Sequence, residues 1–176
     1  MTAHTKLRFT VTVAIFAAML AVLSPFVIPI GPVGITLATL VLAMMAYLAH
    51  PTLAILAVLL YLALGIIGLP VFAGFVGGIA PFASPTGGFL VGYLPFVALL
   101  SLAVHKTKHR MWQILASLAS LAVLYAIGSV WFAIITDATL LSTLTVTTLP
   151  FLIPDILKLI AAHYLAGVIQ SRLRFL

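Results

Sequence analysis

The sequence has 176 residues, of which 65% are hydrophobic and only 6% are charged. A water-soluble fold does not need so much apolar surface, and this composition is typical of a polytopic membrane protein. The net charge of +6 does not indicate nucleic-acid binding, because the basic residues stand in short clusters between hydrophobic segments. The absence of cysteine excludes a disulfide framework and a thiolate metal site.

The hydrophobic segments predict an all-α integral membrane protein, a bundle of six transmembrane helices in a single domain of residues 1–176. A span needs about 20 mostly apolar residues, and shorter spans occur in thin or tilted arrangements. Lys6 and Arg8 precede the first apolar run, but no clear signal-peptide cleavage site follows, so we expect a retained helix. In chain order, the predicted spans are residues 8–26, 33–49, 52–67, 86–104, 111–135 and 150–169.

Residues 69–93, here called the Gly/Pro-rich stretch, are mostly apolar, but glycine or proline occurs every few residues. Irregular backbone at membrane depth is tolerated only where it is buried in protein or lines a cavity. We therefore expect this stretch to roof a binding cavity, although its aromatic side chains could also pack against lipid. The expected walls are Phe72, Phe75, Phe82, Phe89 and Tyr93, with polar contacts from Thr86 and the backbone at Gly87 and Gly88.

The basic residues predict the orientation in the membrane. With six spans, seven of the eight Lys and Arg residues lie on one side, at the N-terminus, in the loop at residues 105–110 and at the C-terminus. By the positive-inside rule this side is cytoplasmic, with both termini inside. Five or seven spans would place the two ends on opposite sides. The first part of the Gly/Pro-rich stretch and the threonine-rich loop at residues 136–149 then share the outer face.

Lys158 is the one basic residue outside these clusters, and Asp155 stands three residues before it in the sixth span. On a helix the two lie about 60° apart on one face, close enough to interact. Ionisable residues in a span are costly and usually mark a functional site, so we favour contacts with a substrate. The structural alternative puts Pro154 at the first helical position and Asp155 in the first turn, where the helix dipole favours a carboxylate.

Together these features predict an outward-facing pocket for a small, largely apolar molecule with one anionic group and a hydrogen-bond donor. The sequence contains few residues that could carry out enzymatic chemistry. Asp137 and Asp155 are the only acidic residues, and no Walker motif for ATP occurs. His105 and His109 lie among basic residues, and we expect no metal site there. We expect no enzyme; the alternative is a membrane enzyme using Asp155 and His163, which are about 12 Å apart along a helix.

Two overlapping pairs of small residues, four apart, stand on the first span: Ala14 with Ala18, and Ala17 with Ala21. Small residues at this spacing let two membrane helices approach closely. The pairs indicate either packing within the bundle or contact with a partner subunit, and both interpretations stay open from the sequence.

In and next to the Gly/Pro-rich stretch stand three distinctive segments, residues 68–74 (GLPVFAG), 77–78 (GG) and 85–93 (PTGGFLVGY). These segments resemble the BioY family, the biotin-binding S components of energy-coupling factor (ECF) transporters. The likeness extends to residues 28–30 and 36–37 and to Asp155 and Lys158, so it covers most of the chain. The chain departs from the family pattern at Ala38, where Gln is common, and at residues 153–154, where Pro-Gly is common.

The resemblance implies six membrane helices, high-affinity biotin capture near the outer face and uptake across the cytoplasmic membrane. Separate proteins would supply the energy, a transmembrane coupling subunit and a pair of ATP-binding cassette ATPases, and this chain would carry no cofactor. Ala14 and Ala18 carry over as contacts to the coupling subunit, and Asp155 and Lys158 as ligand contacts. Charge assigns Lys158 to the biotin carboxylate and Asp155 to a ureido N–H. The alternatives are an S component for a different vitamin and an assembly subunit without a ligand.

Overall fold

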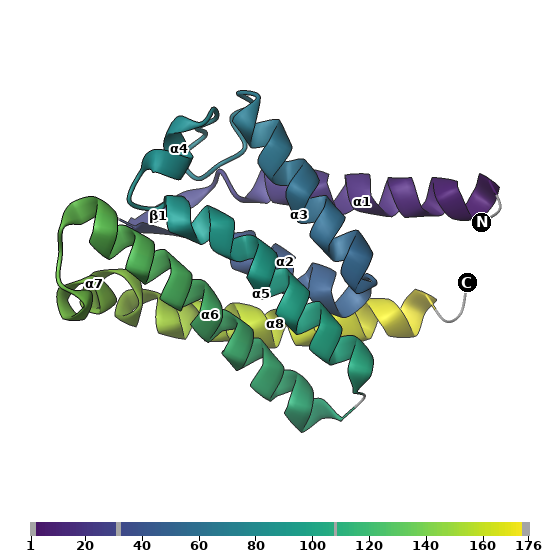
Figure 1. The fold of residues 1–176 in the computed structure, drawn as a ribbon. Helices are drawn as coiled ribbons and strands as arrows, with labels where there is room; N and C mark the ends of the chain where they lie inside the picture. The colour runs from purple at the N-terminus through teal and green to yellow at the C-terminus, as the bar shows by residue number, and fades with distance from the viewer. Residues whose placement is uncertain (1–2, 31–32, 108, 174–176) are drawn as a thin grey trace.

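The computed structural model describes residues 3–30, 33–107 and 109–173. Its longer helices are α1 (Ala3–Leu23), α2 (Ala38–Leu48), α3 (Pro51–Ile66), α5 (Gly87–Lys106), α6 (Arg110–Thr136) and α8 (Leu149–Leu173) (Figure 1). The connections contain the strands β1 (Val27–Ile30) and β2 (Val33–Thr36) and the short helices α4 (Ala80–Ala83) and α7 (Leu140–Thr147). Lys108 and Arg174, two of the predicted cytoplasmic charges, lie outside the described residues.

Four helices in the described ranges, α1, α5, α6 and α8, are long and apolar enough to cross a membrane. The helices α2 and α3 are also apolar but shorter, with 11 and 16 residues. The prediction of a mostly helical protein is confirmed, and four of the six predicted spans correspond to helices that are long and apolar enough to cross a membrane.

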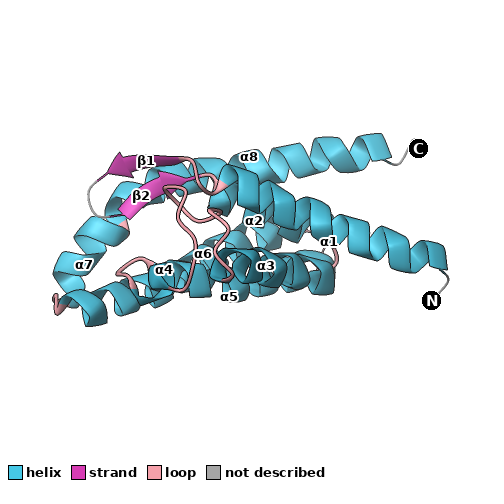
Figure 2. Cartoon of the chain, turned by 90° about the horizontal axis from the view of Figure 1, so that it is seen from above, coloured by secondary structure: helices cyan, strands magenta, loops and turns pink. Residues whose placement is uncertain are grey.

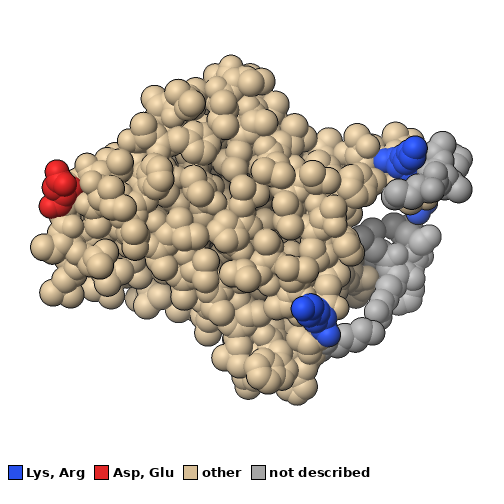
Figure 3. All heavy atoms as spheres, in the orientation of Figure 1, with Lys and Arg blue, Asp and Glu red and all other residues tan. Residues whose placement is uncertain are grey.

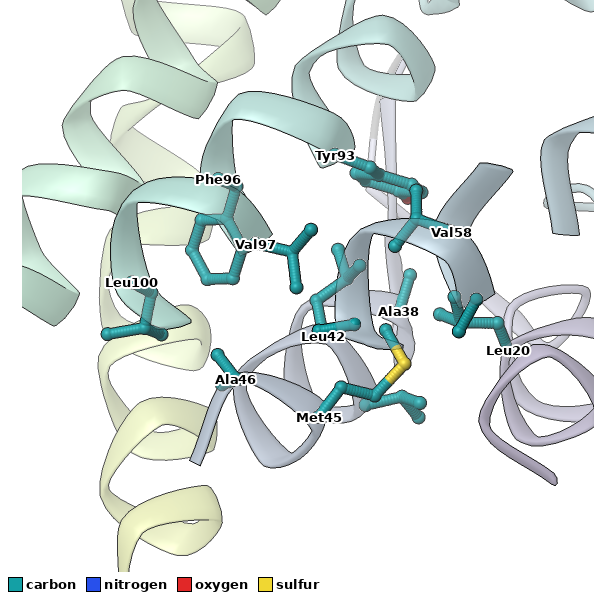
Figure 4. Close-up of a cluster of buried hydrophobic side chains, with 14 of the residues drawn as sticks. Leu20, Ala38, Leu42, Met45, Ala46, Val58, Tyr93, Phe96, Val97 and Leu100 are labelled. Carbon is teal, nitrogen blue, oxygen red and sulfur yellow. The ribbon is translucent and has the colours of Figure 1, made fainter. Parts of the chain in front are cut away.

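Helix α2 lies at the centre of the bundle. Val41, Leu42 and Met45 are fully buried, and the helix packs on α8, α5 and α1. A helix that is apolar on all sides is expected in such a position. Figure 4 shows its side chains in one cluster with Leu20 of α1 and Val58 of α3. Outside this centre, α5 and α6 pack side by side along their length (Figure 1).

The start of the second predicted span differs from the structure. Residues 33–36 form β2, which pairs antiparallel with β1, and α2 begins only at Ala38. A side chain at Gly34 would place its Cβ 2.0 Å from Val27 Cγ2, so the hairpin packs closely over a glycine. Valine, isoleucine and threonine dominate residues 27–36 and favour a strand. A short apolar run does not by itself distinguish strand from helix, which is why the predicted boundary at residue 33 is wrong.

The last helix begins earlier than the structural alternative for Asp155 requires. Helix α8 starts at Leu149, and no acidic residue stands in its first turn. Asp155 therefore does not occupy the position where the helix dipole would favour a carboxylate. The preceding threonine-rich segment contains α7, whose first turn is capped by Thr139, which accepts a hydrogen bond from the Ser142 amide at 3.3 Å.

The two ends of the bundle differ in charge. Helix α1 begins and α8 ends at one end, while the β-hairpin, α4 and α7 lie at the other (Figure 1 and Figure 2). On the face shown in Figure 3, basic side chains lie towards the first end and an acidic side chain lies at the opposite end.

Candidate binding site

A cavity of about 380 Å³ lies in the part of the bundle that carries the β-hairpin, α4 and α7. Most of its wall is apolar and comes from β2, the Gly/Pro-rich stretch and single faces of α5, α6 and α8. Thr39 of α2 and Thr147 of α7 complete the wall. Sites of this size and composition are typical for small organic ligands.

The beginning of the Gly/Pro-rich stretch is held against the cavity by α3. The Tyr61 hydroxyl donates a hydrogen bond to the Val71 carbonyl at 3.2 Å, and the Tyr61 ring packs edge-on against Phe72 with centroids 5.5 Å apart. Gly65 makes room for this ring, because a Cβ there would lie 1.9 Å from Phe72 Cζ. Phe72 is thereby fixed in the cavity wall.

The same stretch contacts the segment that connects α1 to β1. The Gly74 amide donates to the Pro25 carbonyl at 2.9 Å, and the rings of Phe26 and Phe75 meet edge-on with centroids 5.3 Å apart. Gly74 and Gly78 have φ angles of 78° and 88°, which a residue with a side chain adopts only with strain. These glycines let the chain turn back over the cavity.

The end of the stretch is joined to α6. The Trp131 indole N–H donates to the Ser84 carbonyl at 3.1 Å. The hydroxyls of Ser84 and Thr86 lie 3.0 Å apart, and both residues line the cavity at the start of α5.

The charged pair predicted from the sequence lies in the cavity wall on α8. Lys158 Nζ is 2.8 Å from Asp155 Oδ1, and both residues line the cavity. Asp155 is only 5% exposed. A carboxylate this deeply buried requires a counter-charge and hydrogen bonds.

Two hydroxyl groups from other helices complete the surroundings of this carboxylate. Thr39 of α2 donates to Asp155 Oδ1 at 2.8 Å, and Tyr125 of α6 donates to Oδ2 at 2.7 Å. Lys158 Nζ also donates to Thr39 Oγ1 at 3.3 Å. Neither Thr39 nor Tyr125 stands out in the sequence, because hydroxyl side chains in apolar helices form no distinctive pattern. Only the packing of α2, α6 and α8 brings them to Asp155.

Most of the predicted ligand-contacting residues come together. Those that line the cavity are Phe72, Thr86, Phe89, Tyr93, Asp155 and Lys158. Gly87 and Gly88 are not among the lining residues, and both are buried in close contacts with neighbouring helices. A Cβ on Gly87 would lie 2.1 Å from the Phe82 carbonyl oxygen, and a Cβ on Gly88 would lie 2.2 Å from Trp131 Cβ. The two glycines thus let α5 start close to α4 and to α6.

Two aromatic residues expected in the wall lie outside it. Phe75 is 58% exposed and contacts Phe26. Phe82 packs its ring on Phe72, with centroids 5.6 Å apart, and so supports the wall from behind. The sequence places both in the right segment but does not indicate which way their rings point.

The structure separates the two alanine pairs on α1. Ala17 is 1% exposed and Ala21 is half-buried, and α1 packs mainly on α3. Ala14 and Ala18 are exposed on the outer surface of the helix. Ala17 and Ala21 therefore serve packing within the bundle, whereas Ala14 and Ala18 are open to a partner or to lipid.

The histidines singled out by the sequence lie away from the cavity wall. The His163 ring packs edge-on against Tyr47 with centroids 5.1 Å apart. His105 Nδ1 donates to the Ser101 carbonyl at 2.8 Å at the end of α5. Within the described ranges, no three metal-binding side chains come together. Asp155 lines the cavity and His163 does not, so the arrangement does not support the alternative in which both residues act on one substrate.

The comparison with known families covers almost the whole chain, because a model described as the BioY family matches residues 1–175. The chain belongs to the BioY family. Among its BioY relatives, the biotin transporter BioY2 of Lactococcus lactis is 37% identical over 158 residues, which cover 89% of this chain and 87% of that protein. A probable biotin transporter BioY of Pyrococcus horikoshii is 36% identical over 159 residues, which cover 90% of this chain and 94% of that protein.

The fold of this BioY protein is similar to that of a solved structure, the S component for biotin from an ECF-type ABC transporter. The TM-score is 0.89 at 27% sequence identity, and the match covers 97% of this chain and 95% of that chain. The S-component-like architecture expected from the family resemblance is thereby confirmed.

Proposed function

We propose that this protein captures biotin and takes part in its uptake across the cytoplasmic membrane, as the substrate-specific S component of an ECF transporter. The observation that carries this proposal is a mostly apolar cavity whose wall contains the Lys158–Asp155 ion pair, with Nζ 2.8 Å from the buried Asp155 carboxylate. Membership of the BioY family and the likeness to an S component for biotin support this assignment. The function is transport and not catalysis, in line with the named relatives.

The proposed topology has six spans, with both termini in the cytoplasm and the first part of the Gly/Pro-rich stretch on the outer face. At 1.5 Å per residue, α2 is only about 16 Å long and would cross part of a hydrocarbon core of about 30 Å. The β-hairpin and the Gly/Pro-rich stretch would fill the remaining depth, where their backbone is buried in protein or lines the cavity. The basic side chains near the end where α1 begins support a cytoplasmic location of that end (Figure 3).

Both charged residues are proposed to contact the ureido end of biotin. Charge alone assigns Lys158 to the carboxylate, but its Nζ lies 2.8 Å from Asp155 Oδ1, so the two groups meet the same end of an elongated ligand. A ureido group presents a carbonyl acceptor beside N–H donors and complements an adjacent ammonium and carboxylate. Phe72, Phe89 and Tyr93 would pack on the apolar rings and chain.

The biotin carboxylate then needs donors at another place in the cavity. Thr86 and Ser84 line the cavity where α5 begins, and their hydroxyls can rotate towards a ligand. The positive end of the helix dipole favours an anion there. We therefore propose that Thr86 lies near the carboxylate, with the backbone at Gly87 and Gly88 shaping the start of the helix.

Two analogues distinguish the ureido assignment from the carboxylate assignment. In 2-iminobiotin a protonated imino group replaces the ureido oxygen, so a cation would face Lys158 and a charge-assisted hydrogen bond would be lost. We expect it to bind at least about tenfold more weakly than biotin at neutral pH, whereas biotin amide, with a neutral tail, should lose less. Competition calorimetry against biotin measures both. The reverse order of the two analogues would return Lys158 to the carboxylate.

The proposed partners are a transmembrane coupling subunit and a pair of ABC-type ATPases, which would supply the energy, so that this chain needs no cofactor of its own. Ala14 and Ala18 are proposed to contact the coupling subunit. Their outward position on α1 supports this, since small side chains allow close helix approach.

Leucine at Ala14 or Ala18 should abolish biotin uptake by cells that contain the complete transporter, while biotin binding by the purified variant stays within about twofold of the wild type. The added side chain would keep the partner helix away without reaching the cavity. Radiolabelled uptake and calorimetry give the two readouts. Ala161→Leu is a matched control, because Ala161 is exposed on α8. Normal uptake by both α1 variants would contradict the proposed contact.

A further inference from the structure

The Asp155 carboxylate has little remaining capacity for a ligand. An ionised carboxylate accepts about four hydrogen bonds, two on each oxygen. Oδ1 accepts from Thr39 Oγ1 and from Lys158 Nζ, each at 2.8 Å. Oδ2 accepts from the Tyr125 hydroxyl at 2.7 Å. The described structure therefore leaves one acceptor position, on Oδ2.

Lys158 is restricted in the same way. An ammonium group has three N–H donors. One is directed to Asp155 Oδ1 at 2.8 Å and a second to Thr39 Oγ1 at 3.3 Å. The third has no partner among the described residues, and Lys158 lines the cavity. The pair thus presents one donor next to one acceptor.

We propose that Thr39 and Tyr125 are positioning residues, which fix the Asp155–Lys158 pair so that it offers the cavity one acceptor beside one donor. This pattern fits a ligand edge with one N–H next to one C=O, as in a cyclic urea or a lactam. It opposes an edge with two acceptors, such as a carboxylate, and an edge with two donors, such as an amidinium. The link to the ureido group of biotin rests on the proposed function, but the network itself does not.

The geometry favours positioning over direct recognition by these two hydroxyls. Thr39 and Tyr125 are each 7% exposed, and each directs its hydroxyl hydrogen to Asp155, so neither hydrogen is available to a ligand. They also hold Asp155 from two different helices. Helix α6 packs mainly on α5, and α8 packs mainly on α2. The Tyr125–Asp155 hydrogen bond therefore connects α6 to α8, two helices that pack mainly on other neighbours.

Infrared spectroscopy of the ligand-free protein tests the network without reference to biotin. The chain has only two acidic side chains, and Asp137 is exposed at the end of α6. In an Asp137→Asn background with ¹³C-labelled aspartate carboxyl groups, the labelled band reports Asp155 alone. Asparagine tolerates the left-handed backbone found at residue 137. We expect Tyr125→Phe and Thr39→Val each to shift the carboxylate stretching bands, and Tyr47→Phe to leave them unchanged.

Affinity measurements test the consequence for recognition. Tyr125→Phe and Thr39→Val should each weaken biotin binding about tenfold, the amount typical for losing one hydrogen bond to a charged group. Thr39→Ser keeps the hydroxyl and should stay within about threefold of the wild type. Tyr47→Phe is the matched control, since Tyr47 is 6% exposed, has its hydroxyl 2.6 Å from Ser117 Oγ and does not line the cavity.

The two readouts separate the possible failures. Unchanged infrared bands in both Tyr125→Phe and Thr39→Val would overturn the network, whatever the ligand is. Shifted bands with biotin affinity equal to that of the wild type would overturn the positioning role. If the wild-type protein does not bind biotin, the proposed function fails, while the infrared result still decides whether the network exists.

Discussion

Replacing Lys158 by alanine should weaken biotin binding by about 30-fold or more. Truncating one partner of a buried, hydrogen-bonded charge pair costs about 2–5 kcal/mol in a complex, and 1.4 kcal/mol corresponds to a factor of ten. In this protein the change removes the donor that faces the cavity and leaves Asp155, which is 5% exposed, without its counter-charge. Titration calorimetry of the purified variant measures the loss.

The ligand-free Lys158→Ala protein should also be less stable, because an uncompensated buried charge costs about 3–5 kcal/mol of unfolding free energy. A double variant, Asp155→Asn with Lys158→Met, removes both charges and should recover much of the stability but not the binding. This separates recognition from folding. Lys106→Ala is the control, since Lys106 is exposed at the end of α5 and does not line the cavity. Biotin affinity within about threefold of the wild type in Lys158→Ala would rule out the site assignment.

Alanine at Gly88 should destabilise the protein by about 3 kcal/mol and weaken biotin binding. Its Cβ would lie 2.2 Å from Trp131 Cβ and 3.0 Å from the Ile127 carbonyl oxygen, so α5 and α6 would have to move apart. Overpacking a tight contact costs about 1–3 kcal/mol, and the neighbours here are atoms at or near the α6 backbone that cannot rotate away. The shift would also displace Thr86 and Phe89 in the cavity wall.

Gly167→Ala is the matched control for Gly88→Ala. Gly167 lies in α8, is exposed, and a Cβ there meets nothing within 4 Å. Alanine is favoured over glycine in a helix interior, so this variant should be as stable as the wild type or slightly more stable. Thermal unfolding in detergent, with and without biotin, compares the two. Equal stability of the Gly88 and Gly167 variants would mean that α5 and α6 are not in this close contact.

Much of the site was predictable because charge in an apolar chain is informative. Lys158 stood out as the one basic residue away from the loop clusters, and the structure places it beside Asp155 in the cavity wall. The glycines and prolines of residues 69–93 likewise predicted irregular backbone next to a cavity, because such backbone requires protein around it. In both cases polar groups are costly in an apolar environment, and the sequence shows directly where such groups occur.

The parts that could not be predicted depend on packing between distant segments. Strand β2 falls inside the second predicted span, because its residues are as apolar as those of a helix that crosses the membrane. Thr39 and Tyr125 were missed because nothing near them in the sequence distinguishes them from other hydroxyl residues. The close approach of Gly87 to Phe82 and of Gly88 to Trp131 is likewise not visible in the sequence. In each case the deciding contact lies on another helix.

The most direct test of the central proposal is a titration of the purified wild-type protein with biotin, with riboflavin and thiamine as competitors. The cavity with its Asp155–Lys158 pair predicts one saturable site for biotin. An excess of riboflavin or thiamine should not displace biotin from this site. Tighter binding of riboflavin or thiamine than of biotin, or no binding of biotin at all, would contradict the proposed function.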